Sequence, residues 1–140
     1  MAITFIPKDV KVPRIIRLME VKGWIKQVAG SHQKEIDSIA FVFCSAEEIL
    51  TINKKYLQHD YYTDIITFDY SEDNKLSGDV FLSPEIIKSN AAQYHTTYKE
   101  ELLRVIIHGI LHLCGFNDKE SVEQGEMRAK EDEALKMIAL

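Results

Sequence analysis

The sequence contains little that would anchor, cross-link or divide the chain. Its two cysteines, Cys44 and Cys114, lie in apolar segments and are too few for a disulfide framework. We expect both to be buried thiols in a reducing compartment, with a catalytic cysteine paired with His108 or His112 as the alternative. No apolar run approaches the roughly 18 residues of a membrane span, and residues 1–10 lack the basic start and apolar core of a signal peptide. These absences predict a cytoplasmic protein that contacts no membrane.

Internal repeats, low-complexity tracts and linkers rich in proline, glycine or serine are also missing. The chain has 140 residues, 46% of them hydrophobic and 28% charged. A chain of this length and composition can bury its own core without disulfides. We therefore expect one domain over residues 1–140.

Net positive charge is absent as well, since the chain carries a formal charge of −5. This disfavours a protein that coats nucleic acid non-specifically. Residues 8–26 nevertheless gather six basic side chains against two acidic ones. Two interpretations stay open for this segment, a solvated helix face or a local patch that contacts phosphate.

Residue patterns along the chain predict an α+β fold. Runs rich in β-branched and aromatic residues indicate strands at 3–6, 38–44, 63–70 and 78–83, the last two close enough to form a hairpin. Helices are expected at 13–29, 45–57, 83–94, 97–115 and from Ser121 onward, with capping signals at Ser45, Ser83 and Thr97. This order predicts a small mixed four-stranded sheet with helices packed on it.

The segment HGILHLCGFND, residues 108–118, carries the strongest chemical signal. His108 and His112 are four residues apart on the expected helix, so both imidazoles face the same side and can bind one Zn²⁺. Gly115 lets the chain turn back toward the metal, and Asp118 arrives as a third ligand. This is the spacing of the metzincin proteases, H-x-x-x-H-x-x-G-x-x-ligand, with aspartate in third place. The helix is therefore predicted to be a zincin-like metal helix.

Three protein ligands would leave one coordination position for water, which is typical of a catalytic zinc site. A zinc protease also needs a glutamate after its first histidine, and Gly109 occupies that position. Peptide hydrolysis is therefore the weaker interpretation. Asp118 has its own alternatives, because it could cap the last helix or face water.

Other polar residues are candidates for supporting roles. Arg104 lies one helical turn before His108, so it either reaches substrate as a catalytic residue or forms a surface ion pair with Glu100 or Glu101. Asp64 and Asp79 lie at expected strand starts. Either one orients a ligand imidazole through its free N–H or simply closes a turn.

Three segments together resemble the YbeY-type endoribonucleases of ribosomal RNA maturation. HGILHLCGF follows the family motif H-G-x-L-H-L-x-G-[YF], NKKYLQHDYYTDIITF is similar to its N-x-x-[YF]-R…TDVLSF segment, and GDVFLS is similar to its GDIxIS. The resemblance runs from about residue 36 to 133, in the family's order. It implies a metal-dependent endoribonuclease that cleaves single-stranded ribosomal RNA, with Zn²⁺ as cofactor. Small ribosomal subunit proteins or an assembly GTPase are the implied partners.

Two positions depart from the family pattern. Asp118 stands where the family has its third histidine, and Leu57 stands where it has an arginine. The second change removes a guanidinium that would hold a phosphate, for which Lys54, Lys55 or His59 could compensate. These departures keep a non-catalytic, metal-binding ribosome-assembly factor open as an alternative. Tyr61 and Tyr62 would offer stacking surfaces for unpaired bases or serve as packing residues.

Overall fold

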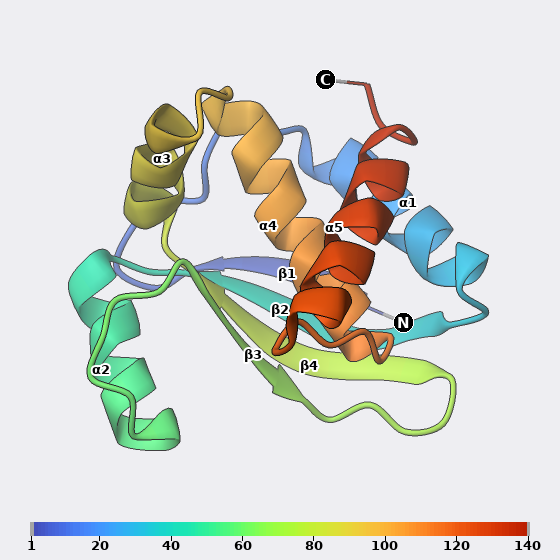
Figure 1. The fold of residues 1–140 in the computed structure, drawn as a ribbon, viewed down its shortest axis with the longest axis horizontal. Helices are drawn as coiled ribbons and strands as arrows, with labels where there is room; N and C mark the ends of the chain where they lie inside the picture. The colour runs from blue at the N-terminus through green and yellow to red at the C-terminus, as the bar shows by residue number, and fades with distance from the viewer. Residues whose placement is uncertain (1, 140) are drawn as a thin grey trace.

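The computed structural model describes residues 2–139 and contains one four-stranded mixed sheet (Figure 1). Its strands are β1 (Ala2–Pro7), β2 (Glu35–Phe43), β3 (Ile65–Asp69) and β4 (Lys75–Leu82), in the order β1-β2-β4-β3. β1 and β4 pair parallel with β2, while β3 pairs antiparallel with β4. The predicted hairpin and the predicted mixed sheet are both confirmed.

Five helices accompany the sheet. They are α1 (Leu18–Ser31), α2 (Ala46–Leu57), α3 (Pro84–Gln93), α4 (Tyr98–Leu113) and α5 (Ser121–Leu135). Figure 1 shows α4 lying across the sheet between α3 on one side and α1 and α5 on the other. α2 packs near β3, on the opposite face of the sheet. The α+β class predicted from the sequence is therefore confirmed.

Local capping signals explain where several helices begin. The side-chain hydroxyls of Ser45, Ser83 and Thr97 each accept a hydrogen bond from a backbone N–H three residues later. These caps satisfy N–H groups that have no partner inside the helix. At α5 the cap is Glu120 rather than Ser121, because Glu120 and Glu123 form a reciprocal capping box.

The first helix differs from its expected range. It was predicted over residues 13–29, but α1 begins at Leu18, after a turn that buries Ile16. Pro13 holds the residue before it extended, and Ile15 and Ile16 are β-branched, so the chain enters the helix late. The basic segment 8–26 therefore spans a loop and a helix rather than one helix face. Lys8 within it pairs with Glu48 on α2, at 2.9 Å.

Alternating side chains of β4 explain the two hydrophobic clusters. Leu76, Val80 and Leu82 are buried in the main cluster with α4, while Phe81 faces the smaller cluster that contains Ile49 of α2. Such alternation follows from the two-residue repeat of a strand. Along β4 the sheet is thus buried on the α4 face and partly buried on the other.

The last helix is tied to the first by a buried hydrogen bond. The indole Nε1 of Trp24 on α1 donates to the carbonyl of Ala134 on α5, at 2.8 Å. Trp24 is the single tryptophan of the chain. None of the helices within residues 2–139 combines the length and hydrophobicity needed to cross a bilayer.

Candidate metal centre

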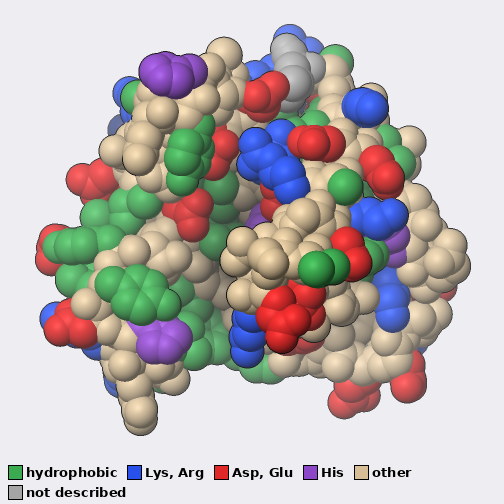
Figure 2. Space-filling model, in the orientation of Figure 1, with side chains coloured by type: hydrophobic (Ala, Val, Ile, Leu, Met, Phe, Trp, Pro, Cys, Tyr) green, Lys and Arg blue, Asp and Glu red, His purple; other side chains and the backbone are tan. Residues whose placement is uncertain are grey.

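The residues singled out in the HGILHLCGFND segment meet at one cleft. It has a volume of roughly 470 Å³ and is lined by His108 and His112 of α4, by Asp118 from the loop after it, and by Glu131 of α5. The start of β3 and the end of α2 form its other wall. Figure 2 shows the cleft as a hollow between the α2–α3 side and the α5 side of the molecule. The structure therefore brings all three predicted ligands to one site.

His108 is held between two carboxylates. Its Nε2 lies 3.3 Å from Oδ2 of Asp118, and its Nδ1 lies 2.7 Å from Oε2 of Glu131. Glu131 was not anticipated from the sequence, where Asp64 or Asp79 was considered for this role. It lies 23 residues after His108 and no motif marks it, so only the packing of α5 on α4 reveals the contact.

The donor atoms suit a zinc ion in part. Two ligands bound to tetrahedral Zn²⁺ at roughly 2.0–2.1 Å stand about 3.3–3.4 Å apart. The 3.3 Å between His108 Nε2 and Asp118 Oδ2 equals that edge. Within residues 2–139 no three His, Cys, Asp or Glu side chains are arranged as a complete metal site. His108 and Asp118 are thus at ligand spacing, with His112 lining the same cleft.

Burial and negative charge shift the pKa values of several side chains in the cleft. Burial lowers the pKa of His108, but the hydrogen bond to Glu131 and the charges of Glu131, Asp118 and Asp64 outweigh it, so the pKa is raised overall. Burial also raises the pKa of both Asp64 and Glu101, which line the cleft. The cleft is therefore rich in carboxylates and favours a cation.

Two guanidinium groups also line the cleft. Arg104 donates to Glu131 at 3.0 Å and to Asp132 at 2.8 Å, so its ion-pair partners lie on α5 and not at Glu100 or Glu101. Arg128, on α5, is more exposed, and its nearest carboxylate oxygen, on Glu131, is 3.9 Å away. Arg128 too was not identified from the sequence, because α5 carries no recognisable motif.

Gly109 explains why the protease glutamate is missing. A Cβ at this position would lie 3.1 Å from Val80 Cγ1 and 3.2 Å from Ile65 Cδ1. The position therefore faces β3 and β4, where a larger side chain would be crowded. Glycine lets α4 approach β3 and β4 closely, which places the histidines beside β3.

The segment between α2 and β3, residues 58–64, forms the rim of the cleft, and we call it the rim loop. Leu57 just before it and Thr63 and Asp64 at its end line the cleft. The imidazole of His59 stacks on the ring of Tyr61, with centroids 5.2 Å apart. Both side chains are exposed, so the loop presents a flat aromatic surface beside the cleft.

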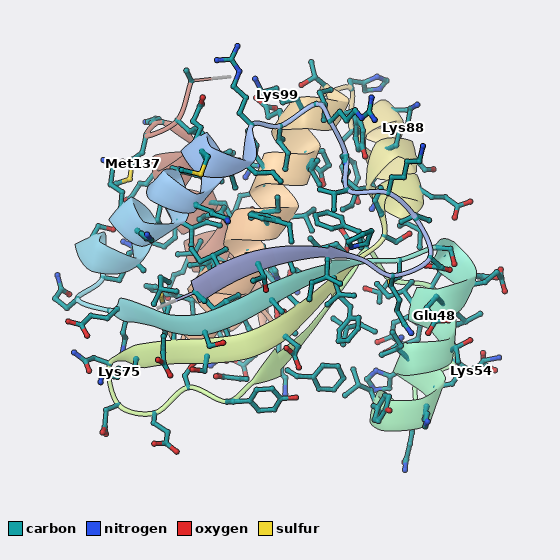
Figure 3. All side chains as sticks on the ribbon, turned by 180° about the vertical axis from the view of Figure 1, so that it is seen from behind. Glu48, Lys54, Lys75, Lys88, Lys99 and Met137 are labelled. Atoms are coloured by element: carbon teal, nitrogen blue, oxygen red, sulfur yellow. The ribbon has the colours of Figure 1, made fainter. Side chains whose placement is uncertain are left out.

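Lys54, Lys55 and His59, which could compensate for the family arginine, are not among the residues that line the cleft. Lys54 pairs with Asp60 at 3.2 Å, and the Lys55 ammonium lies 5.3 Å from the centre of the Tyr56 ring. Figure 3 shows Lys54 at the outer end of α2. Leu57 itself does face the cleft, where it leaves an apolar wall.

Neither cysteine contributes to the cleft. Cys44 is fully buried and Cys114 is half-buried, and burial raises their pKa values to about 12 and about 11. The thiol of each residue is therefore protonated at neutral pH and unsuited to nucleophilic attack.

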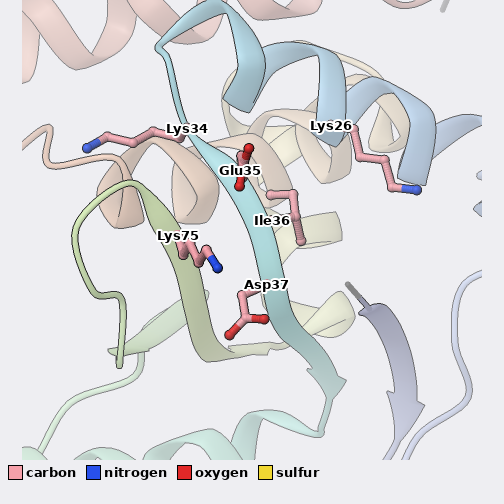
Figure 4. A pocket seen from close by; sticks show the side chains of 6 residues that line it. All are labelled: Lys26, Lys34, Glu35, Ile36, Asp37 and Lys75. Atoms are coloured by element: carbon pink, nitrogen blue, oxygen red, sulfur yellow. The ribbon is translucent and has the colours of Figure 1, made fainter.

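A second pocket, of roughly 520 Å³, lies at the other end of the sheet (Figure 4). It is lined by Lys26, Lys34, Glu35, Ile36, Asp37 and Lys75. It holds three amino groups and two carboxylates, so charges of both signs line it. None of these lining residues is a histidine or a cysteine. The candidate metal ligands are therefore all in the first cleft, between α4 and α5, which we call the α4–α5 cleft.

A helix with two histidines laid over a small mixed sheet, with two carboxylates against the imidazole of His108, is typical of a metal-dependent hydrolase. Comparisons with known proteins give the particular family. The model of the family described as Endoribonuclease YbeY matches residues 7–139. The chain therefore belongs to the YbeY endoribonuclease family, whose members act in ribosomal RNA maturation.

Close relatives and one solved structure agree with this assignment. The Endoribonuclease YbeY of Bacteroides fragilis is 56% identical over 137 residues, covering 98% of both chains. The Parabacteroides distasonis protein of the same name is 52% identical over 138 residues, covering 99% of this chain and 96% of its own. The solution structure of TM1509 from Thermotoga maritima is similar, with a TM-score of 0.70 and 25% identity over 97% of this chain and 88% of that one. The resemblance inferred from the sequence is confirmed.

Proposed function

We propose that the α4–α5 cleft is the RNA-cleaving centre of this metal-dependent endoribonuclease, with His108, His112 and Asp118 holding one Zn²⁺ per chain. The observation that carries the proposal is the 3.3 Å between His108 Nε2 and Asp118 Oδ2, a spacing that two ligands of one tetrahedral zinc ion would also have. Imidazole and carboxylate are both ligands that zinc accepts. His112 lines the same cleft and would supply the third ligand.

A divalent metal in this cleft supplies a Lewis acid for a phosphate oxygen and lowers the pKa of a bound water. The protein's own residues then bind and orient the RNA. We propose a catalytic role for Arg104 because it lines the cleft one helical turn before His108; to contact the scissile phosphate its guanidinium would have to exchange part of its pairing with Glu131 and Asp132. Arg128 adds a second, more exposed guanidinium on the same wall. Charge stabilisation of this kind is the main requirement of phosphoryl chemistry.

The rim loop suits an unpaired strand. Bases stack on aromatic faces with little dependence on sequence, and the exposed His59–Tyr61 stack of the rim loop offers such a face. The proposed substrate is accordingly single-stranded ribosomal RNA in the cytoplasm. Small ribosomal subunit proteins or an assembly GTPase are the proposed partners.

Peptide hydrolysis is disfavoured by the orientation of residue 109. The Cβ of a glutamate there would be crowded against Val80 and Ile65. The cleft thus lacks the base that a zinc protease has after its first histidine.

The test is cleavage of a labelled single-stranded RNA by zinc-loaded protein and by His112→Ala purified in the same way. We expect the substitution to reduce the cleavage rate by more than roughly 100-fold, since even partners of metal ligands contribute 10- to 100-fold. His95→Asn is the matched control, because His95 is exposed, lies outside the cleft and has a positive φ of 57° that asparagine tolerates.

Each outcome of this test has a distinct meaning. Equal cleavage by wild type and His112→Ala would place the activity outside this cleft. If neither the wild type nor any variant cleaves RNA, although the wild type binds zinc, the assembly-factor alternative replaces the catalytic one.

A further inference from the structure

The carboxylate of Glu131 reaches the cleft from α5 and is almost completely enclosed. Its side chain is 7% exposed, and its Oε2 lies 2.7 Å from Nδ1 of His108. We infer that Glu131 is a positioning residue, which fixes the tautomer and ring orientation of His108 so that Nε2 faces the metal. The inference rests on the proposed function, in which His108 is a zinc ligand.

Hydrogen-bond chemistry determines which nitrogen carries the proton. An ionised carboxylate can only accept, so Nδ1 of His108 must donate to Glu131. The neutral imidazole has one N–H, for which Glu131 at Nδ1 and Asp118 at Nε2 compete. The contact to Glu131 is the shorter, 2.7 Å against 3.3 Å, so we place the proton on Nδ1 and leave the lone pair of Nε2 for a metal. A histidine without the Glu131 contact would divide between two tautomers and rotate about its side-chain bonds. Only part of its population would then present the right nitrogen to a metal.

Glu131 is itself fixed by Arg104. The guanidinium of Arg104 donates from one nitrogen to Glu131 Oε1 at 3.0 Å and from the other to Asp132 at 2.8 Å. Both oxygens of the buried carboxylate are therefore satisfied, one by Arg104 and one by His108, which offsets the cost of burying its charge. Arg104 and His108 are four residues apart on α4, so a single carboxylate from α5 bridges two successive turns of that helix.

The neighbouring Asp132 gives a matched control. It also accepts from Arg104, but its side chain is 53% exposed and it makes no hydrogen bond to His108. Asp132→Asn removes one carboxylate from the α4–α5 contact and leaves the His108 partner in place. Glu131→Gln removes the charge at His108 with almost no change in shape. A purely structural role of the α4–α5 ion pairs would affect both variants, whereas positioning of His108 would affect only Glu131→Gln.

Two measurements test the inference. The first is the nitrogen NMR spectrum of the histidine side chains in the metal-free protein, recorded at a pH above the raised pKa of His108, where the neutral imidazole reports its tautomer directly. We expect a single tautomer with the proton on Nδ1 in wild type and Asp132→Asn, and a mixture in Glu131→Gln. The second is zinc affinity, measured by competition with a chromophoric chelator. There we expect a loss of roughly 10- to 100-fold for Glu131→Gln and less than about 3-fold for Asp132→Asn.

An unchanged His108 tautomer in Glu131→Gln, together with wild-type zinc affinity, would overturn the inference. If Glu131→Gln fails to fold, Glu131→Asp replaces it, because the shorter side chain cannot span the 2.7 Å contact and the same spectral change is expected. The NMR arm needs no metal, so it stays informative even if His112→Ala shows that the cleft does not cleave RNA. Failure of the proposed function and failure of this inference are therefore separable.

Discussion

Single residues decide how α4 meets the sheet and what it presents to the cleft. Gly109 lies between His108 and Ile110 with its α-carbon against Val80 and Ile65. This position allows the close approach, and it leaves no room for the glutamate of a zinc protease. The same residue thus accounts both for the packing of the helix and for the absence of a base.

A glutamate introduced at position 109 is predicted to destabilise the fold. Gly109→Glu would bury an unpaired carboxylate between two aliphatic side chains, with an expected loss of at least about 3 kcal/mol in the free energy of unfolding. Gly125→Glu on α5 is the control, since a Cβ there meets nothing within 4 Å. It should gain up to about 1 kcal/mol from helix propensity. Urea unfolding followed by circular dichroism measures both, and equal stability of the two variants would contradict the packing argument.

Motif spacing was enough to predict which residues gather in the cleft but not how they are held. His108, His112 and Asp118 are close in sequence and share a helix and its following turn, so local geometry brings them together. Glu131 and Arg128 belong to the cleft through the packing of α5, which no local pattern encodes. The predicted partners of Arg104 on its own helix were wrong for the same reason, because two carboxylates of α5 come closer.

At the scale of elements, local signals predicted the helices that have side-chain caps. α2, α3 and α4 begin where Ser45, Ser83 and Thr97 predicted, since a cap is a contact over three residues. α1 has no side-chain cap at Arg17, and its start was predicted five residues too early. α5 was recognised as a helix, but its contribution to the cleft depends on tertiary packing.

The rim loop joins two such elements, and its aromatic surface leads to a prediction about substrate binding. Tyr61→Ala should raise the KM for single-stranded RNA by roughly 5-fold or more, because base stacking contributes about 1–3 kcal/mol. The kcat should stay near wild type, since Tyr61 does not line the cleft. Tyr70→Ala is the control, as Tyr70 is similarly exposed but follows the far end of β3. A KM unchanged by Tyr61→Ala would remove the rim loop from the binding surface.

For the whole molecule, one sheet connects the two hydrophobic clusters. β4 contributes Leu76, Val80 and Leu82 to one cluster and Phe81 to the other, so neither cluster can form without it. The expectation of one domain over residues 1–140 therefore leads to a prediction of a single cooperative unfolding transition.

Trp24 provides the probe for that prediction. Its indole reports the contact between α1 and α5, whereas far-ultraviolet circular dichroism reports all helices. We expect the urea midpoints from tryptophan fluorescence and from circular dichroism to coincide. An earlier fluorescence transition would mean that α5 separates from the rest before the sheet unfolds, which would contradict a single cooperative unit.

The position of Glu131 on α5 also has a consequence for the order of events during synthesis. The chain emerges from its amino end, so the helix with His108 and His112 is made before the carboxylate that orients His108. The centre of the sheet likewise cannot form before β4 has been synthesised, because β4 pairs with β2. The cleft is therefore assembled in stages. The sheet and α4 come first, and the contact of His108 with Glu131 forms last. If the cleft cleaves RNA as proposed, its site is completed only when α5 has packed on α4.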